Sequence, residues 1–199
     1  MRAFWISVRM TIVLTVLTGI IYPLAMTAAA KVIFPWQAGG SLVENGGKVV
    51  GSALIGQNFS KPQYFHPRPS AAGDKGYDAS NSGGSNLGPT NKVLIDTVRK
   101  RIQEVIANNP GVTAGEIPVG MVTASASGLD PEISPAGAEV QIPRVARARG
   151  LSEDRVGELV RQNTRSRWMG IFGEPGVNVL RLNLDLDRIR TARSAGGSP

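Results

Sequence analysis

The chain has 199 residues, 42% of them hydrophobic and 19% charged, and its formal net charge is +7. It contains no cysteine, which excludes disulfides, thiolate metal sites, cysteine nucleophiles and a lipid-modified N-terminal cysteine. Its one histidine, His66, excludes a multi-histidine metal site, so we expect no bound metal. His66 is also the single possible base for Ser-His-Asp chemistry.

The first predicted element is a membrane helix. Residues 10–30 run for 21 positions without a charge, and a helix of that length covers about 31 Å, which matches the hydrocarbon core of a bilayer. We therefore predict a basic N-terminus over 1–9 and a transmembrane helix over 10–30. A cleaved signal peptide is the alternative, because Arg2 and Arg9 resemble a basic leader and residues 28–30 resemble a cleavage site.

One face of this helix predicts a partner. Thr11, Thr15 and Gly19 follow one another at a spacing of four, and small or hydroxyl residues in this register let two helices approach and hydrogen-bond in lipid. The alternative is that these residues are merely tolerated. Pro23 predicts a kink, or a freed carbonyl that a neighbouring group must satisfy.

The charges beside the helix predict its orientation. Arg2 and Arg9 precede it, and cytoplasmic flanks of membrane helices are enriched in Lys and Arg. We therefore expect a cytoplasmic N-terminus and a soluble domain outside the cytoplasm.

Behind the helix we predict a connector over 31–48, a soluble α+β domain over 49–190 and a disordered tail over 191–199. Residues 49–56 are rich in β-branched and apolar side chains and predict a strand. Residues 58–91 are rich in Gly, Pro, Ser and Asn, and a loop of that length is functional or disordered. Its aromatic residues favour an ordered loop. These are Phe59, Tyr64, Phe65 and Tyr77.

Three helical stretches follow in the domain. The apolar residues of 91–108 recur at spacings of three and four, which predicts an amphipathic helix. Ser134 is expected to cap the next stretch, with Pro143 interrupting it, and Ser152 is expected to cap another helix.

Two segments predict further strands. Residues 119–123 read as a short buried strand, and residues 177–187 alternate strictly from Leu180 onward, as in a half-buried strand. The predicted strands and helices do not alternate as regular βαβ units, which favours the α+β class.

Three features suggest chemistry weakly. The glycine-rich run 82–88 lacks the lysine of a phosphate-binding loop, so it either cradles an anion with backbone amides or forms a tight turn, which we favour. Ser125 and Ser127 are the candidate nucleophiles of a membrane-anchored or secreted serine hydrolase. We favour the alternative that their hydroxyls cap the turn at 130–131. His66 precedes a proline and is more typical of a turn residue than of a base.

The domain is basic as well. Seven arginines and three acidic residues lie between Arg144 and Arg167. Such a surface suits nucleic-acid phosphate or an anionic membrane, or is simply solvated or faces a partner. The mixed signs favour the solvated or partner-facing interpretation.

Five blocks of the chain together closely resemble one family, the C subunit (KdpC) of the bacterial Kdp high-affinity potassium-transporting P-type ATPase. They cover residues 22–42, 51–71, 77–91, 122–150 and 173–187. The resemblance implies an accessory, non-catalytic subunit of an ATP-driven potassium uptake pump in the bacterial inner membrane, supporting assembly and activity. It also implies three partners, which are an ATP-hydrolysing P-type subunit, a channel-like potassium-binding subunit and a very small membrane subunit.

The resemblance further implies a role as a catalytic chaperone that raises the ATP affinity of the hydrolysing subunit, with no tightly bound cofactor and with ATP acting through the complex. Gln141 matches the family's block before Arg144 and is the nucleotide candidate, although we favour a structural role for its amide near Pro143. The expected topology conflicts with direct contact, because ATP is cytoplasmic. A domain outside the cytoplasm would act by packing against the channel-like subunit, on assembly or on ion access.

Overall fold

A computed structural model describes residues 1–195, with side chains through Ile189. The chain divides into two compact units, residues 1–43 and residues 44–199. Within the described residues, one helix is long and apolar enough to cross a membrane, and it runs from Arg2 to Ile33 in the first unit.

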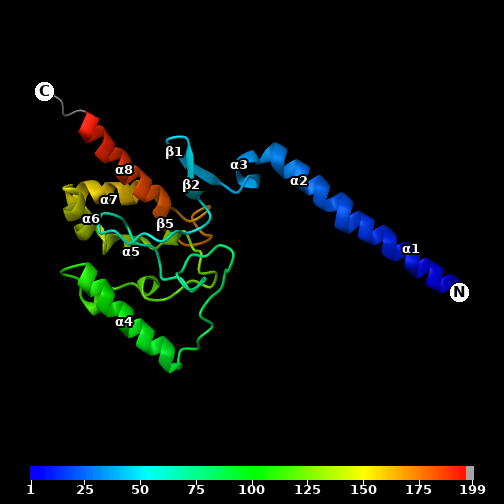
Figure 1. Cartoon of the computed structure of the whole chain (residues 1–199), viewed down its shortest axis with the longest axis horizontal. Helices are drawn as coiled ribbons and strands as arrows, with labels where there is room; N and C mark the ends of the chain where they lie inside the picture. Colours follow the sequence, from blue (N-terminus) through cyan, green and yellow to red (C-terminus); the bar gives the residue numbers. More distant parts are fainter. Residues whose placement is uncertain (196–199) are drawn as a thin grey trace. The chain divides into compact units, whose positions relative to one another are not determined.

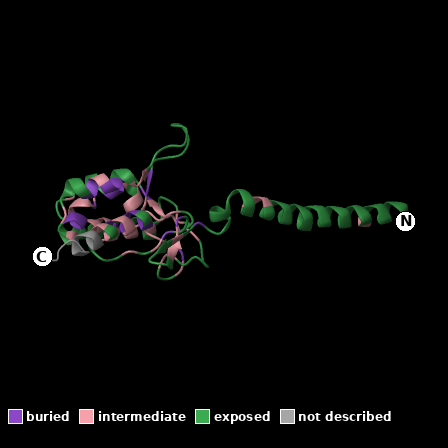
Figure 2. Cartoon of the chain, turned by 90° about the horizontal axis from the view of Figure 1, so that it is seen from above, coloured by how far each residue is buried: buried purple, intermediate pink, exposed green. Residues whose placement is uncertain are grey.

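This helix consists of α1 (Arg2–Val16), the π-helical turn η1 (Leu17–Ile21) and α2 (Tyr22–Ile33), in blue in Figure 1. Almost all of its residues are exposed, as Figure 2 shows. The predicted spanning helix is therefore confirmed, with eight more residues at its start and three more at its end.

The π-helical turn η1 lies directly before Pro23. Proline has no N–H, and its ring would collide with the carbonyl of Gly19 in a regular α-helix, so a wider turn accommodates it. Two hydroxyls satisfy backbone carbonyls nearby, each four residues back and at 2.7 Å, from Thr18 and Thr27. The helix itself thus supplies the local adjustment that Pro23 requires.

A short helix and a hairpin follow. Helix α3 covers Pro35–Ala38, and the strands β1 (Leu42–Asn45) and β2 (Lys48–Ser52) form a two-stranded sheet. Gly46 and Gly47 have φ angles of 59° and 75°, the left-handed conformation that a two-residue hairpin turn requires. The strand predicted over 49–56 overlaps β2, but it ends at Ser52, where a turn begins.

The core of the domain lies among a small sheet and four helices. Strands β3 (Glu132–Ile133), β5 (Gly176–Asn178) and β4 (Thr164–Arg165) are antiparallel in the order β3-β5-β4. The helices are α5 (Pro135–Glu139), α6 (Ile142–Arg149), α7 (Glu153–Gln162) and α8 (Val179–Ala195). The buried cluster consists of Phe65, Ile133, Ala138, Val145, Ala146, Val156, Leu159, Val160, Val177, Val179, Leu182 and Leu186. The α+β prediction is confirmed.

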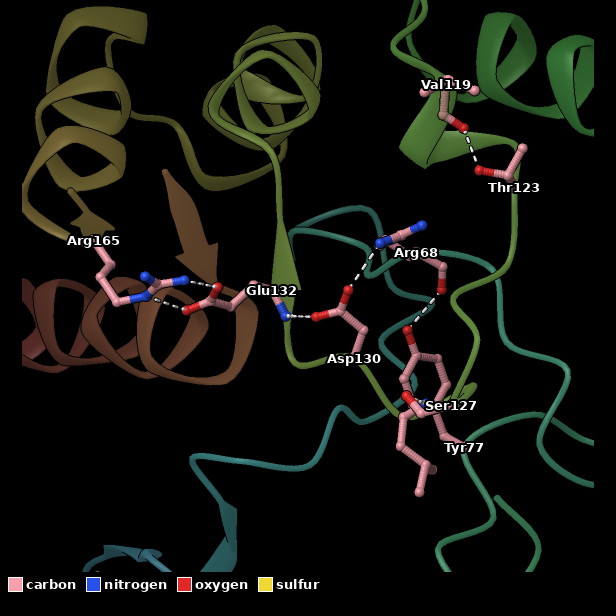
Figure 3. Close-up of polar contacts among 9 residues, drawn as sticks. Arg68, Tyr77, Val119, Thr123, Ser127, Asp130, Glu132 and Arg165 are labelled. Atoms are coloured by element: carbon pink, nitrogen blue, oxygen red, sulfur yellow. Dashed lines mark hydrogen bonds and ion pairs between the residues drawn. The ribbon is translucent and has the colours of Figure 1, made fainter. Parts of the chain in front are cut away.

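The predicted helix over 91–108 is α4 (Lys92–Asn108), with the Asn91 side chain accepting from the Val93 N–H at 2.8 Å. Two short 3₁₀ turns follow, η2 (Ala114–Glu116) and η3 (Val119–Met121). The strand predicted over 119–123 is therefore wrong. The Thr123 hydroxyl donates to the Val119 carbonyl at 2.8 Å and closes a helical turn (Figure 3). Val119 is not buried, since it is 73% exposed.

The predicted helix starts are confirmed. The Ser134 hydroxyl accepts from the Gly137 N–H at 3.0 Å, and the Ser152 hydroxyl accepts from the Arg155 N–H at 3.3 Å. The interruption lies between α5 and α6, at residues 140–141. Pro143 falls in the first turn of α6, where the missing N–H has no intrahelical partner to lose.

The strand predicted from Leu180 is wrong, because these residues form α8. The leucines alternate, but Val179, Leu182, Asn183 and Leu186 also recur at helical spacing, and all four are buried. Leucine favours helix over strand, and Asn183 occupies an inward position that the alternation assigned to solvent. Helix α8 extends to Ala195, and the rest of the expected disordered tail, 196–199, lies outside the described residues.

Candidate functional site

The long loop predicted over 58–91 has no helix or strand, yet two buried amides hold it firmly. From α8, Asn183 Oδ1 accepts from the Phe65 N–H at 2.8 Å, and Asn183 Nδ2 donates to the Phe65 carbonyl at 3.0 Å. Before α6, Gln141 makes the same pair of bonds to His66, at 2.7 and 3.2 Å. The loop is therefore ordered, as its aromatic residues predicted.

Gln141, the nucleotide candidate, uses its whole amide inside the domain. Besides the two bonds to His66, its oxygen accepts from Arg144 Nη2 at 2.7 Å and its nitrogen donates to the Gly137 carbonyl at 3.0 Å. An amide has two acceptor positions and two donors, and here all are occupied in a side chain that is 1% exposed. This geometry favours the structural role over a nucleotide contact.

Arg144 joins the loop to two helices. Its Nη1 donates to the carbonyls of Pro62 and Tyr64, at 2.5 and 2.9 Å. Its Nε donates at 3.0 Å to Oδ1 of Asn109, the residue that directly follows α4. Burial lowers the pKa of Arg144 to about 10, so the guanidinium remains charged at neutral pH. Neutral oxygens rather than a carboxylate surround this charge, which is consistent with a structural cation.

A second arginine has a similar role. The side chain of Arg149 is 5% exposed, and it donates to Asp187 Oδ1 at 2.9 Å and to the Gln63 carbonyl at 2.6 Å. Its guanidinium also lies 5.0 Å from the centre of the Tyr64 ring. The expectation of a solvated arginine surface is therefore wrong for Arg144 and Arg149, which face inward because the loop carbonyls need donors.

A cavity of about 520 Å³ lies between the loop and α4. Its charged and titratable lining has both signs, with Arg68, Lys75, Arg101, Asp74, Glu104 and His66. Burial, and secondarily the charge of Arg144, lowers the pKa of His66, which is therefore neutral at pH 7. The carboxylates of Asp74 and Glu104 lie beside the cations of this cavity and would repel a triphosphate, so the cavity is poorly suited to one.

A second polar network, drawn in Figure 3, connects the loop to the sheet. Asp130 accepts from Arg68 Nη1 at 2.8 Å and from the Glu132 N–H at 3.0 Å, and the Tyr77 hydroxyl donates to the Arg68 carbonyl at 2.6 Å. Arg165 then pairs with Glu132 through two hydrogen bonds, at 3.1 and 2.8 Å. Burial, and then the charge of Asp130, raises the pKa of Tyr77, so its hydroxyl remains a donor.

The two candidate serines are not placed for catalysis. The Ser127 hydroxyl accepts from the Leu129 N–H at 3.1 Å, which is the capping role favoured from the sequence. His66 lines the cavity beside α4, whereas Ser125 and Ser127 line a different one. In the part of the chain that the structure describes, neither serine hydroxyl has a hydrogen bond to a base, so the geometry gives the hydrolase alternative no support.

The glycine-rich run 82–88 packs against the serine segment. The Ser82 hydroxyl and the Gly83 N–H both donate to the Ser127 carbonyl, at 2.9 Å each. A Cβ at Gly84 would lie 3.0 Å from the Ala126 carbonyl oxygen. This close approach accounts for Gly84, whereas a Cβ at Gly83 or Gly88 would meet nothing within 4 Å. The packing of the run against residues 126–127 favours the turn over an anion cradle.

The predicted partner face of the membrane helix is open. Thr11, Thr15 and Gly19 are exposed, and a Cβ at Gly19 would meet nothing within 4 Å. Unlike Thr18, neither Thr11 nor Thr15 hydrogen-bonds through its hydroxyl to any residue that the structure describes. These groups remain available to another helix. Within the same described residues, no group of three His, Asp or Glu side chains is close enough to hold a metal ion.

Comparison with known proteins extends these observations from single residues to the whole chain. The sequence profile of KdpC, described as the K⁺-transporting ATPase, c chain, matches residues 4–188. The chain belongs to the KdpC family. It is therefore an accessory subunit of a potassium-transporting ATPase and a single-pass membrane protein. The matched KdpC region includes the membrane helix.

Individual KdpC relatives match over nearly their full length. A potassium-transporting ATPase KdpC subunit of Polaromonas naphthalenivorans is 55% identical over 92% of this chain and 93% of its own. That of Rhodospirillum rubrum is 58% identical over 87% and 89%, and that of Variovorax paradoxus is 57% identical over 90% and 93%. The resemblance found in the five sequence blocks is thereby confirmed.

Proposed function

We propose that this chain is a non-catalytic subunit that supports assembly and activity of a high-affinity potassium uptake pump. Its partners are the ATP-hydrolysing P-type subunit, the channel-like potassium-binding subunit and the small membrane subunit. The observation that carries the proposal is the family match, which covers the exposed membrane helix and the domain in one piece.

The contacts of the polar side chains support a non-catalytic role. The buried polar side chains that most resemble a site, Gln141 and Arg144, have protein partners for their hydrogen bonds. Ser127 caps a backbone N–H. These contacts support a scaffold that presents surfaces to other subunits.

The proposed location is the bacterial inner membrane, with the N-terminus in the cytoplasm and the domain outside it. Arg2 and Arg9 support this orientation through the positive-inside tendency. In that orientation the domain does not meet ATP. An effect on the ATP affinity of the hydrolysing subunit is then indirect and passes through the channel-like subunit.

The proposed contact in the membrane is the face formed by Thr11, Thr15 and Gly19. Small side chains allow close approach, and the two hydroxyls provide hydrogen bonds to a neighbouring helix. A large side chain at Gly19 would hold the two helices apart.

The experiment compares Gly19→Leu with Leu17→Phe, which adds bulk on another face of the same helix. We expect Gly19→Leu to reduce copurification of the other pump subunits and potassium-dependent ATPase activity, and Leu17→Phe to leave both unchanged. Equal effects of the two substitutions would argue against this face. Deletion of the whole chain tests the broader proposal, because a complex that is fully active without it would refute the supporting role.

A further inference from the structure

The hairpin between β4 and β5 ends in four large apolar side chains, here called the apolar tip: Trp168, Met169, Ile171 and Phe172. They are 67%, 72%, 73% and 59% exposed, respectively. Single exposed apolar residues are ordinary, but four within five positions form a contiguous patch that normally marks an interaction surface.

The apolar tip has a defined backbone. Trp168 and Phe172 pair through reciprocal N–H to carbonyl bonds of 2.9 and 3.0 Å, and their ring centres are 5.7 Å apart. Met169 and Gly170 lie at the apex with φ angles of 51° and 76°, and the Ile171 N–H donates to the Trp168 carbonyl at 3.2 Å. Three residues, 169–171, connect the paired Trp168 and Phe172. The two with positive φ occupy positions that favour Asn or Gly, so the left-handed conformation of Met169 is unfavourable. The fold nevertheless places an apolar side chain there.

The base of the hairpin is anchored and basic. Arg165 on β4 bonds both carboxylate oxygens of Glu132 on β3, across the intervening strand β5, as Figure 3 shows, and this contact raises the pKa of Arg165. Arg167 directly precedes the apolar tip and is exposed, with no ion pair to any residue in the described part of the chain. A free cation therefore lies beside the apolar side chains.

We propose that the apolar tip inserts into the headgroup region of the phospholipid bilayer that holds the chain's own helix, as a second and reversible anchor. Tryptophan and other aromatic side chains prefer the membrane–water interface, and an adjacent arginine is attracted to anionic lipid headgroups. Ten residues, 34–43, separate the membrane helix from the domain unit, and they span at most about 35 Å. This tether keeps the domain close to the bilayer, at a high effective concentration.

We favour the bilayer over a pocket on another subunit as the binding surface of the apolar tip. The connector 34–43 links the domain to the membrane helix of the same chain, so contact with the bilayer needs no partner. The proposal is also independent of the orientation of the helix, since either leaflet offers an interface, and of the accessory role in the pump. A contact with another subunit is therefore a distinguishable outcome of the same experiment.

The test uses the full chain in nanodiscs containing phosphatidylglycerol. Because the chain has no cysteine, Ile171→Cys provides a single site for a nitroxide label. Val119→Cys is the matched control, since Val119 and Ile171 are both aliphatic and both 73% exposed. Collision of the label with oxygen and with a water-soluble nickel chelate reports its depth. We expect the label at 171 to be shielded from the nickel chelate and the label at 119 to be accessible.

A second variant tests the role of the aromatic pair. Adding Trp168→Ser and Phe172→Ser to Ile171→Cys should shift the partition equilibrium away from the bilayer by at least about tenfold, or about 1.4 kcal/mol. An unchanged Tm would show that the domain is intact. Equal accessibility of the labels at 171 and 119 would overturn the proposal. So would shielding of position 171 only after the other pump subunits are added, which would identify a subunit contact instead.

Discussion

At the scale of single residues, the side chains best suited to chemistry bind the backbone of an irregular loop instead. Residues 58–91 lack the internal hydrogen bonds of a helix or sheet, so their buried N–H and carbonyl groups need other partners. Gln141, Asn183 and Arg144 supply them. The residue types alone suggested a binding or catalytic site, whereas the hydrogen bonds of these side chains show that they have structural roles.

The first prediction concerns Gln141. Gln141→Ala leaves the N–H and carbonyl of His66 unsatisfied in a buried setting and removes a partner of Arg144, so we expect the free energy of unfolding to fall by about 2–4 kcal/mol. Gln162→Ala is the control, because Gln162 is exposed and should cost less than about 0.5 kcal/mol. Chemical denaturation measures both changes. A Gln141→Ala protein of normal stability that had lost binding of ATP would favour the nucleotide role.

The second prediction concerns His66. Burial and Arg144 lower its pKa below 6.5 in the folded state, so the unfolded chain binds a proton at higher pH than the folded chain does. The stabilising contribution is complete above about pH 6.5 and is lost as the pH falls from 6.5 toward the folded pKa. Because His66 is the only histidine, His66→Gln should flatten the pH dependence of unfolding between pH 5 and 7. Identical slopes for the two proteins would contradict this.

At the scale of elements, close packing of the loop against the 123–131 segment determines where glycine is required. Gly128 has a φ of 66°, and a Cβ there would lie 2.7 Å from both the Ala72 nitrogen and the Gly83 oxygen. Gly150, after α6, has a φ of 63° but open space around it. The two glycines share a conformation and differ in their surroundings.

The third prediction uses this pair. Gly150→Ala introduces only the strain of the left-handed conformation, so it should lower the free energy of unfolding by about 1–2 kcal/mol. Gly128→Ala also forces two backbone segments apart. It should therefore lower the free energy of unfolding by more than about 3 kcal/mol, and lower Tm more than Gly150→Ala does. Thermal and denaturant unfolding measure the difference. Equal losses at the two positions would mean that the loop moves away without cost.

At the scale of the whole molecule, the orientation of the membrane helix determines which account of function is physically available. A domain outside the cytoplasm cannot contact cytoplasmic ATP, whereas a domain inside can. The helix is exposed along almost its whole length, which suits contact with both lipid and other subunits.

The fourth prediction tests this orientation. Glu153→Cys places a unique thiol at an exposed position beside the Ser152 cap, and Ala3→Cys places one at the N-terminal end of the membrane helix. With a membrane-impermeant maleimide on intact cells, we expect labelling at 153 and none at 3 until the cells are permeabilised. The reverse pattern would place the domain in the cytoplasm and restore direct ATP contact as an explanation.

The sequence alone predicted the features that depend on local pattern. The charge-free run over 10–30, the amphipathic helix of α4 and the Ser134 and Ser152 caps are short-range signals, and the family resemblance needed only the order of residues. Those predictions were confirmed because spacing along the chain determines them directly.

Tertiary structure decided what the local pattern left ambiguous. The leucines from Leu180 fit both a strand and a helix, and burial of Asn183 against Phe65 accompanies the helix. Gln141 and Arg144 lie more than 70 positions from the loop residues that they bind, so no local pattern reports these contacts. Long-range hydrogen bonding of a loop without regular structure is visible only when the chain is folded.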